Sequence, residues 1–191
     1  FFDNVRVPAA NLMGRLNEGW SIAKRLLQHE RTMISGFGLT SGQGDRGGTT
    51  STTASLEGAA MHYRGDKDRL SDPALRDQIA QFKIDSEAFA LTSQRSSEES
   101  KQGGPTATSS MLKYYGCELN KRRYELFLKA MGSQGLGWEG DEFEAEELQV
   151  TREWLRSKAN SIEGGTAEVQ LNIVAKRVLG LPDMLSLASK K

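Results

Sequence analysis

The sequence predicts an all-α protein, an up-down four-helix bundle preceded by a short β segment. Apolar residues recur at helical spacing in several long stretches, glycine-marked turns separate those stretches, and only the start of the chain has the pattern of a strand. A chain of 191 residues can bury one sizeable core. We therefore expect one bundle domain over residues 18–191, and a leading segment over residues 1–17.

Composition excludes several classes of function. The 25 Lys and Arg residues balance the 25 Asp and Glu residues, so no charge-driven binding to nucleic acid or to an anionic membrane is expected. Cys117 is the single cysteine, which excludes an intrachain disulfide framework and a cysteine-based zinc site. No stretch approaches the roughly 20 apolar residues of a membrane span, and no signal-peptide pattern opens the chain. We expect a cytoplasmic protein without a metal site.

The leading segment has the pattern of one strand, since residues 1–8 are largely apolar and end in a proline. A single strand cannot satisfy its own backbone hydrogen bonds. We expect it to be the last strand of a β domain that this chain lacks, followed by a linker; pairing with another chain is the alternative.

The first helix is expected to open at Glu18-Gly19-Trp20 and to run to about Gly36. One broad apolar stripe along it is interrupted by a carboxylate, Glu30, and we expect this stripe to face the core. A carboxylate in such a place is costly unless it is paired, protonated or used in chemistry. An ion pair across the bundle and a position at the rim are the structural alternatives.

The glycine-rich stretch 36–53 is expected to be irregular, and it contains no phosphate-binding motif. A short helix follows over residues 54–63. Asp72-Pro73 has the pattern of an N-cap followed by proline at the first helical position. Apolar residues at helical spacing then mark the core face of this helix and of the next one, which runs to about Met131: Leu75, Ile79, Phe82, Phe89, Leu112, Tyr115, Leu119 and Leu126.

Beyond the glycine turn 132–135, the acidic run 139–147 is expected to be solvated, and residues 150–159 to be helical. The last helix follows a turn at Gly164-Gly165-Thr166. Amide groups at such a turn can bind an anion or a polar cofactor group, although a plain capped turn would have the same sequence. The last apolar stripe consists of Val169, Ile173, Val174 and Val178.

Three segments together resemble the acyl-CoA dehydrogenase family. They are the opening FFDNVRVP, the Gly19-Trp20 helix start and the block SIEGGTAEVQ, which leads to AKRVLGLP. The resemblance covers essentially the whole chain but only the C-terminal half of the family's proteins, whose N-terminal helical domain and middle β domain this chain lacks.

The resemblance implies FAD-dependent α,β-dehydrogenation of an acyl-CoA thioester, with electrons passing to an electron-transferring flavoprotein. It also implies a homo- or hetero-tetramer, and an isolated chain that is inactive. In many members the catalytic base directly precedes the Gly-Thr of the last turn, where this chain has Gly164. In other branches the base lies on the first helix of this domain and is followed by arginine, which Glu30-Arg31 matches. Glu30 is therefore the predicted base, Glu163 the runner-up, and Arg31 an orienting residue.

Further positions match the family's FAD site. A segment that carries an FAD-binding arginine falls on 67–73, where Lys67 or Arg69 could supply the positive charge. The other matched cofactor positions are Gly132, Gly135, Gly164, Gly165, Thr166 and Glu168. Two alternatives remain open: a non-catalytic helical assembly module that needs a partner, and a related flavin enzyme such as an acyl-CoA oxidase or a nitroalkane oxidase.

Overall fold

The computed structural model describes residues 1–40, 55–101 and 108–182, without the side chains of residues 28, 31–40, 100 and 108. Within these ranges the chain is mostly helical, which confirms the predicted all-α class. The α-helices are α1 (Gly19–Thr40), α2 (Leu56–Arg64), α3 (Pro73–Lys101), α4 (Thr108–Met131), α5 (Ala145–Ala159) and α6 (Ala167–Ile173). The shorter elements are η1 (Ala9–Asn11), β1 (Gly65–Asp66), β2 (Arg69–Leu70), η2 (Gly132–Leu136) and η3 (Val174–Val178).

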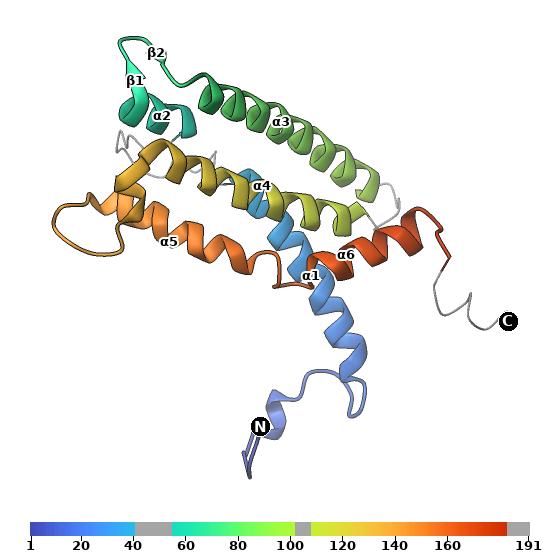
Figure 1. Ribbon diagram of the computed structural model, residues 1–191. Helices are drawn as coiled ribbons and strands as arrows, with labels where there is room; N and C mark the ends of the chain where they lie inside the picture. Colours follow the sequence, from blue (N-terminus) through green and yellow to red (C-terminus); the bar gives the residue numbers. More distant parts are fainter. Residues whose placement is uncertain (41–54, 102–107, 183–191) are drawn as a thin grey trace, which may run out of the picture.

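Helix α4 is the centre of the bundle, because the other five α-helices pack against it. In Figure 1, α3 and α5 run along opposite sides of α4, and α1 crosses it. Helix α6 lies beside the beginning of α4, where it follows directly from the end of α5. Residues 160–166, between α5 and α6, are therefore held close to the central helix.

The main core lies between α2, α3, α4 and α5. Its burial of apolar surface is the principal force that holds these helices together. The buried residues are Leu56, Ala59, Ala60, Leu70, Leu75, Ile79, Leu126, Phe127, Ala130, Met131 and Val150. A smaller cluster of Phe89, Leu112 and Leu119 joins α3 to α4. The predicted core positions are thus largely confirmed, with Tyr115 as an exposed exception.

The predicted start of α3 is confirmed in detail. The Asp72 carboxylate accepts hydrogen bonds from the backbone N–H groups of Ala74 and Leu75, at 2.9 and 3.0 Å. Pro73 then occupies the first helical position, where its missing N–H costs nothing. Helix α2 begins in a similar way, since the Ser55 hydroxyl accepts from the Gly58 N–H at 2.9 Å. The break expected at Gly103-Gly104-Pro105 lies outside the described residues.

A small hairpin between α2 and α3 was not expected from the sequence. Strands β1 and β2 pair antiparallel, with Gly65 opposite Leu70 and Asp66 opposite Arg69. Lys67 lies in the turn with a positive φ of 55°. The hairpin is too short to show a period-2 pattern, which explains why sequence periodicity did not reveal it.

Residues 1–8 form no strand in the structure, which is a correction to the sequence analysis. A strand needs a neighbour to complete its hydrogen-bond ladder, and in the described part of the chain β1 and β2 pair only with each other. The assignment of residues 1–17 to a preceding β domain stays a prediction.

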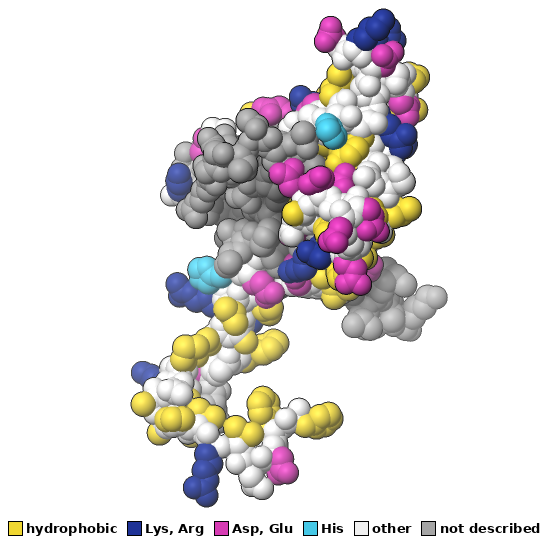
Figure 2. Space-filling view, turned by 90° about the vertical axis from the view of Figure 1, so that its left-hand side faces the viewer, with side chains coloured by type: hydrophobic (Ala, Val, Ile, Leu, Met, Phe, Trp, Pro, Cys, Tyr) yellow, Lys and Arg dark blue, Asp and Glu magenta, His cyan; other side chains and the backbone are white. Residues whose placement is uncertain are grey.

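Helix α1 begins where the sequence predicts, but it continues through Thr40 rather than ending at about Gly36. The expected core-facing stripe is also wrong for the first half of this helix, because Trp20 is 72% exposed and Leu27 is 37% exposed. Figure 2 shows hydrophobic side chains gathered over this part of α1 and the segment before it. The apolar pattern is present, but this half of α1 extends away from the other helices (Figure 1).

The acidic run 139–147 is solvated except at its end. Glu147 is only 3% exposed, and its carboxylate accepts a 2.7 Å hydrogen bond from the Tyr63 hydroxyl. It also accepts from the backbone N–H of Glu144 at 2.8 Å, which completes a capping box at the start of α5. Two donors from separate parts of the fold thus compensate the burial of this carboxylate.

The last apolar stripe is not core-facing either, since Val169 and Val178 are exposed. The helix also changes geometry partway along the stripe, from α6 to the π-helical η3. None of the described helices is long and apolar enough to cross a membrane. The cytoplasmic location stays a prediction.

Candidate functional site

Glu30 lies near the middle of α1, which packs against α4. Its side chain is partly buried, and it forms no ion pair or hydrogen bond with another described residue. The ion pair considered from the sequence is therefore not found among the described side chains. The Arg31 side chain lies outside the described part, so its orienting role stays a prediction.

The turn between α5 and α6 has the backbone that its glycines predict. Gly164 and Gly165 both have positive φ, 67° and 101°, a region that residues with a Cβ rarely adopt. Thr166 then caps α6, since its hydroxyl accepts from the Val169 N–H at 3.4 Å. Glu168 is exposed in the first turn of α6, and hydrogen bonds from its own backbone and from Thr166 lower the pKa of its carboxyl.

Two fully buried polar side chains hold this turn from inside the bundle. Lys113 of α4 and Gln170 of α6 are both 0% exposed. The Lys113 Nζ donates to the Gly165 carbonyl at 2.7 Å. The Gln170 Nε2 donates to the Gly164 carbonyl at 3.1 Å and to the Gly165 carbonyl at 3.5 Å. Both consecutive carbonyls of the turn are thus satisfied by buried donors.

The end of α5 is tied to α4 by a second buried network. The Asn120 side-chain amide donates to the Asn160 side-chain oxygen at 2.9 Å, and the Cys117 thiol contacts the Asn160 carbonyl at 3.0 Å. Burial raises the pKa of the Cys117 thiol, which keeps it in its neutral form at physiological pH. These contacts hold the start of the turn against α4, and Lys113 and Gln170 hold its end.

Glu163, the runner-up base, is engaged in an ion pair. The Arg156 guanidinium donates to both of its carboxylate oxygens, at 2.8 and 3.3 Å, and the Asn160 side-chain amide donates to one of them. Partial burial works to raise the pKa of Glu163, but these hydrogen bonds outweigh it and hold the pKa below its ordinary value. A carboxylate with three donors is a weaker proton acceptor than an unpaired one.

Because of this ion pair, we expect the free energy of unfolding to fall at acid pH. Because the folded pKa of Glu163 lies below its unfolded value of 4.5, the stabilisation is complete above that value and is lost as the pH falls through the folded pKa. We expect urea unfolding to show wild type more stable than Glu163→Gln at neutral pH, with the difference shrinking as the pH falls below 4.5. A difference that stays constant with pH would contradict this assignment.

The remaining predicted cofactor residues lie at the other end of α4. Gly132 and Gly135 follow the last residue of α4, about 28 Å from Lys113 along the helix axis. The Arg64 guanidinium donates to the Ala130 carbonyl at 3.0 Å, which holds α2 and the adjoining hairpin at this end. Lys67 and Arg69 are exposed on that hairpin. The predicted cofactor residues therefore form two separate groups in one chain.

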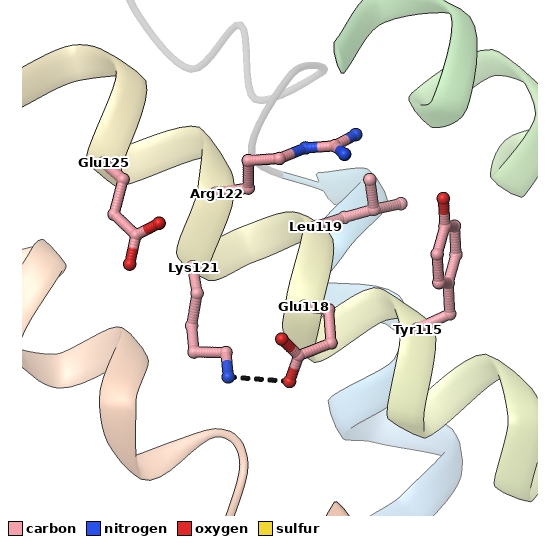
Figure 3. A pocket seen from close by; sticks show the side chains of 6 residues that line it. All are labelled: Tyr115, Glu118, Leu119, Lys121, Arg122 and Glu125. Atoms are coloured by element: carbon pink, nitrogen blue, oxygen red, sulfur yellow. Dashed lines mark ion pairs between the residues drawn. The ribbon is translucent and has the colours of Figure 1, made fainter. Parts of the chain in front are cut away.

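Two of the pockets along α4 were not predicted from the sequence. One, of about 280 Å³, is lined by Tyr115, Glu118, Leu119, Lys121, Arg122 and Glu125, all on α4 (Figure 3). Its cations are already compensated, since Lys121 pairs with Glu118 at 2.6 Å and Arg122 pairs with Asp85 of α3. The other, of about 520 Å³, is a largely apolar groove between α3, α4 and α6. Among the described residues, no cluster of His, Cys, Asp or Glu could hold a metal ion.

Four buried polar residues around the turn were not predicted from the sequence: Lys113, Asn120, Asn160 and Gln170. A signal was present for Gln170, which lies four residues after Thr166 and three before Ile173, so it shares their helix face. It interrupts an apolar stripe in the same way that Glu30 does.

The fold and the held turn define the class of this protein, an all-α bundle domain that presents a glycine turn between two helices against its central helix. Residues 17–179 match the family model of the acyl-CoA dehydrogenase C-terminal domain. The chain therefore belongs to the acyl-CoA dehydrogenase family, as the resemblance predicted.

Its relatives carry the same family name. Acyl-CoA dehydrogenase IpdE1 of Mycolicibacterium smegmatis is 28% identical over 182 residues, which are 95% of this chain and 42% of the relative. Acyl-CoA dehydrogenase FadE34 of Mycobacterium tuberculosis is 27% identical over 183 residues, 95% of this chain and 22% of the relative. The chain thus spans less than half of the length of each.

Solved structures share the fold. The Tcur3481-Tcur3483 steroid ACAD matches with a TM-score of 0.76 and 22% identity, over 95% of this chain and 44% of that one. The ChsE4-ChsE5 complex from Mycobacterium tuberculosis matches with a TM-score of 0.66 and 24% identity, over 96% and 45%.

Proposed function

We propose that this chain supplies the catalytic base and part of the FAD site of an acyl-CoA dehydrogenase. The reaction removes a proton from the α-carbon and a hydride from the β-carbon of an acyl-CoA thioester, and an electron-transferring flavoprotein takes up the electrons. The observation that carries this proposal is Glu30, a partly buried carboxylate without a described partner, in a family member whose last turn has Gly164 at the alternative base position.

The two candidate bases differ in their surroundings. Glu30 has no ion-pair partner among the described side chains, and a carboxylate is a suitable general base. Glu163 is neutralised by Arg156 and is also hydrogen-bonded to Asn160. We therefore assign the α-proton to Glu30, and to Glu163 the structural task of joining the end of α5 to the turn.

The chain's residues fit an FAD group in two respects. The carbonyls of Gly164 and Gly165 are bonded inward, and Gly165 is partly exposed and has no side chain, so the backbone at Gly165 can approach a flat ring closely. Exposed Lys67 and Arg69 suit a diphosphate. Family members use FAD, which when bound supplies the acceptor for the β-hydride.

The separation of the two groups of residues supports an assembled enzyme. Gly164, Gly165, Thr166 and Glu168 would contact one FAD, while the group at the far end of α4, with Gly132 and Gly135, would contact the FAD of a neighbouring subunit. One chain cannot bring both groups to the same cofactor, because about 28 Å of α4 lies between them. A homo- or hetero-tetramer, as predicted, would satisfy both.

A helical assembly module without catalysis is the second candidate. The exposed apolar side chains of α1 and of the segment before it favour this reading, since such a surface typically marks an interaction site. In that case the chain would join a partner without contributing a base.

Anaerobic titration of the complete enzyme with acyl-CoA substrates separates these functions. We expect loss of flavin absorbance on substrate addition and its recovery with an electron-transferring flavoprotein. An assembled protein that binds no FAD would contradict the proposal and favour the assembly module. Recovery in air without the flavoprotein would instead indicate an oxidase.

A further inference from the structure

The groove between α3, α4 and α6 has the size and the lining of a ligand site. Its volume of about 520 Å³ lies within the range of about 300–1,000 Å³ that small-molecule sites have. Phe89, Leu112 and Leu171 contribute one apolar side chain from each of the three helices. Phe89 and Leu112 belong to the buried cluster that joins α3 to α4, while Leu171 is exposed. The packing of the bundle thus fixes the groove, and its apolar lining continues to the surface.

The groove lies on a different face of α4 from the turn between α5 and α6. Met111 and Tyr115 line the groove, and each is two residues away from Lys113. Two residues correspond to about 200° around an α-helix, so these side chains leave α4 on nearly the opposite side from Lys113. Lys113 contacts the turn, at the Gly165 carbonyl. A ligand in the groove would therefore not occupy the surface of the turn.

The charge at the groove favours an anionic group. Arg95 of α3 is the one charged residue among the described residues that line it, whereas the pocket in Figure 3 is lined by Glu118 and Glu125 as well as by cations. The Arg95 side chain is 69% exposed, and its described ion-pair partner is Glu99, one helical turn further along α3 and 3.6 Å away. An exposed pair of this kind contributes little to stability, so the carboxylate of a ligand can replace Glu99.

We propose that this groove binds an amphiphile with a long alkyl chain and one carboxylate, the chain against the apolar lining and the carboxylate against Arg95. The guanidinium fork can donate to both oxygens of a carboxylate. Thr92, which also lines the groove, is already compensated, since its hydroxyl donates to the Ala88 carbonyl at 2.7 Å. An extended peptide would bring backbone N–H and C=O groups against a lining with few groups to pair with them, whereas an alkyl chain has none to pair.

The test is calorimetric titration of the complete enzyme with dodecanoate, dodecanol and dodecyltrimethylammonium, which share an alkyl chain and differ in the charge of the head group. We expect dodecanoate to bind most tightly and the ammonium compound most weakly. Arg95→Gln should weaken the binding of dodecanoate about tenfold, as for the loss of one charge-assisted hydrogen bond, and leave that of dodecanol unchanged. Arg76→Gln is the matched control, since Arg76 is also an exposed arginine of α3 but does not line the groove.

A second variant fills the groove without changing its charge. Ala88 lines the groove and is exposed, so Ala88→Trp should leave the core intact. We expect this variant to lose the binding of both dodecanoate and dodecanol, and to keep the wild-type rate of acyl-CoA-dependent flavin reduction.

Two results would overturn this inference. Equal affinity for dodecanoate in wild type, Arg95→Gln and Ala88→Trp would mean that the ligand binds elsewhere. The absence of saturable binding to wild type would mean that the groove takes no such ligand, as when a second copy of the chain covers it. Wild type without flavin reduction would contradict the proposed function instead, because binding in the groove requires neither FAD nor Glu30.

Discussion

Glu30→Gln in the complete enzyme is expected to slow acyl-CoA-dependent flavin reduction by about 10²- to 10⁴-fold, while FAD stays bound. Glutamine has nearly the shape of glutamate but cannot accept the α-proton. No described residue is ion-paired to Glu30, so loss of its charge should leave no described cation unpaired. Anaerobic stopped-flow reduction, with FAD content measured in parallel, separates lost chemistry from lost cofactor.

Three further variants make this test specific. Glu30→Asp keeps a carboxylate on a shorter side chain and should retain more activity than Glu30→Gln. Glu18→Gln alters an exposed carboxylate just before α1 and should leave the rate unchanged. Glu163→Gln should lower the free energy of unfolding, and it should slow flavin reduction less than Glu30→Gln does. If Glu163→Gln abolishes reduction and Glu30→Gln does not, the base is Glu163.

The parts of the fold that depend on local chemistry were predictable from the sequence. Asp72-Pro73 predicted the start of α3. Gly65 predicted the end of α2, and the glycines after Met131 predicted the end of α4. Each of these signals acts through backbone hydrogen bonds within a few residues, so no knowledge of packing is needed to read it.

What depends on packing partners was predicted less well. The apolar stripes of α1 and α6 show which face is hydrophobic, but periodicity does not say what covers it, and Trp20 and Val169 are exposed here. Glu147 was expected in water and is buried, because Tyr63 reaches it from a position 84 residues earlier. Lys113 meets Gly165 across 52 residues, a contact that follows only once α4 and the turn are placed together.

In the candidate site, too, the features that depend on local chemistry were predicted and those that depend on packing were not. Gly164, Gly165 and Thr166 form the predicted turn with the predicted cap, because positive φ and a hydroxyl at the N-cap are local requirements. The role of Glu30 came from the resemblance and stays a prediction, since the side chains of residues 31–40, which follow it on α1, lie outside the described part of the structure.

Gly165→Ala is expected to be among the most damaging single changes in this chain. A φ of 101° costs a residue with a Cβ about 1–3 kcal/mol of folding free energy. The new Cβ would lie 2.6 Å from the Nε2 of Gln170. That amide is fully buried and bonded to the Gly164 carbonyl, so it cannot move aside without losing its hydrogen bond, and overpacking adds about 1–3 kcal/mol.

Two other glycines separate the cost of backbone strain from the cost of overpacking. Gly180 has a φ of 64°, but a Cβ there would meet no atom of the described residues within 4 Å, so Gly180→Ala measures mainly the backbone strain. Gly19 has neither a positive φ nor a described neighbour within 4 Å of an added Cβ, so Gly19→Ala should not lower the free energy of unfolding. In urea unfolding, the loss of unfolding free energy should be largest for Gly165→Ala, smaller for Gly180→Ala and smallest for Gly19→Ala. The FAD content should fall only for Gly165→Ala. Equal losses of unfolding free energy for Gly165→Ala and Gly180→Ala would mean that the Gln170 side chain moves aside without cost. The turn would then not be held as tightly as its hydrogen bonds indicate.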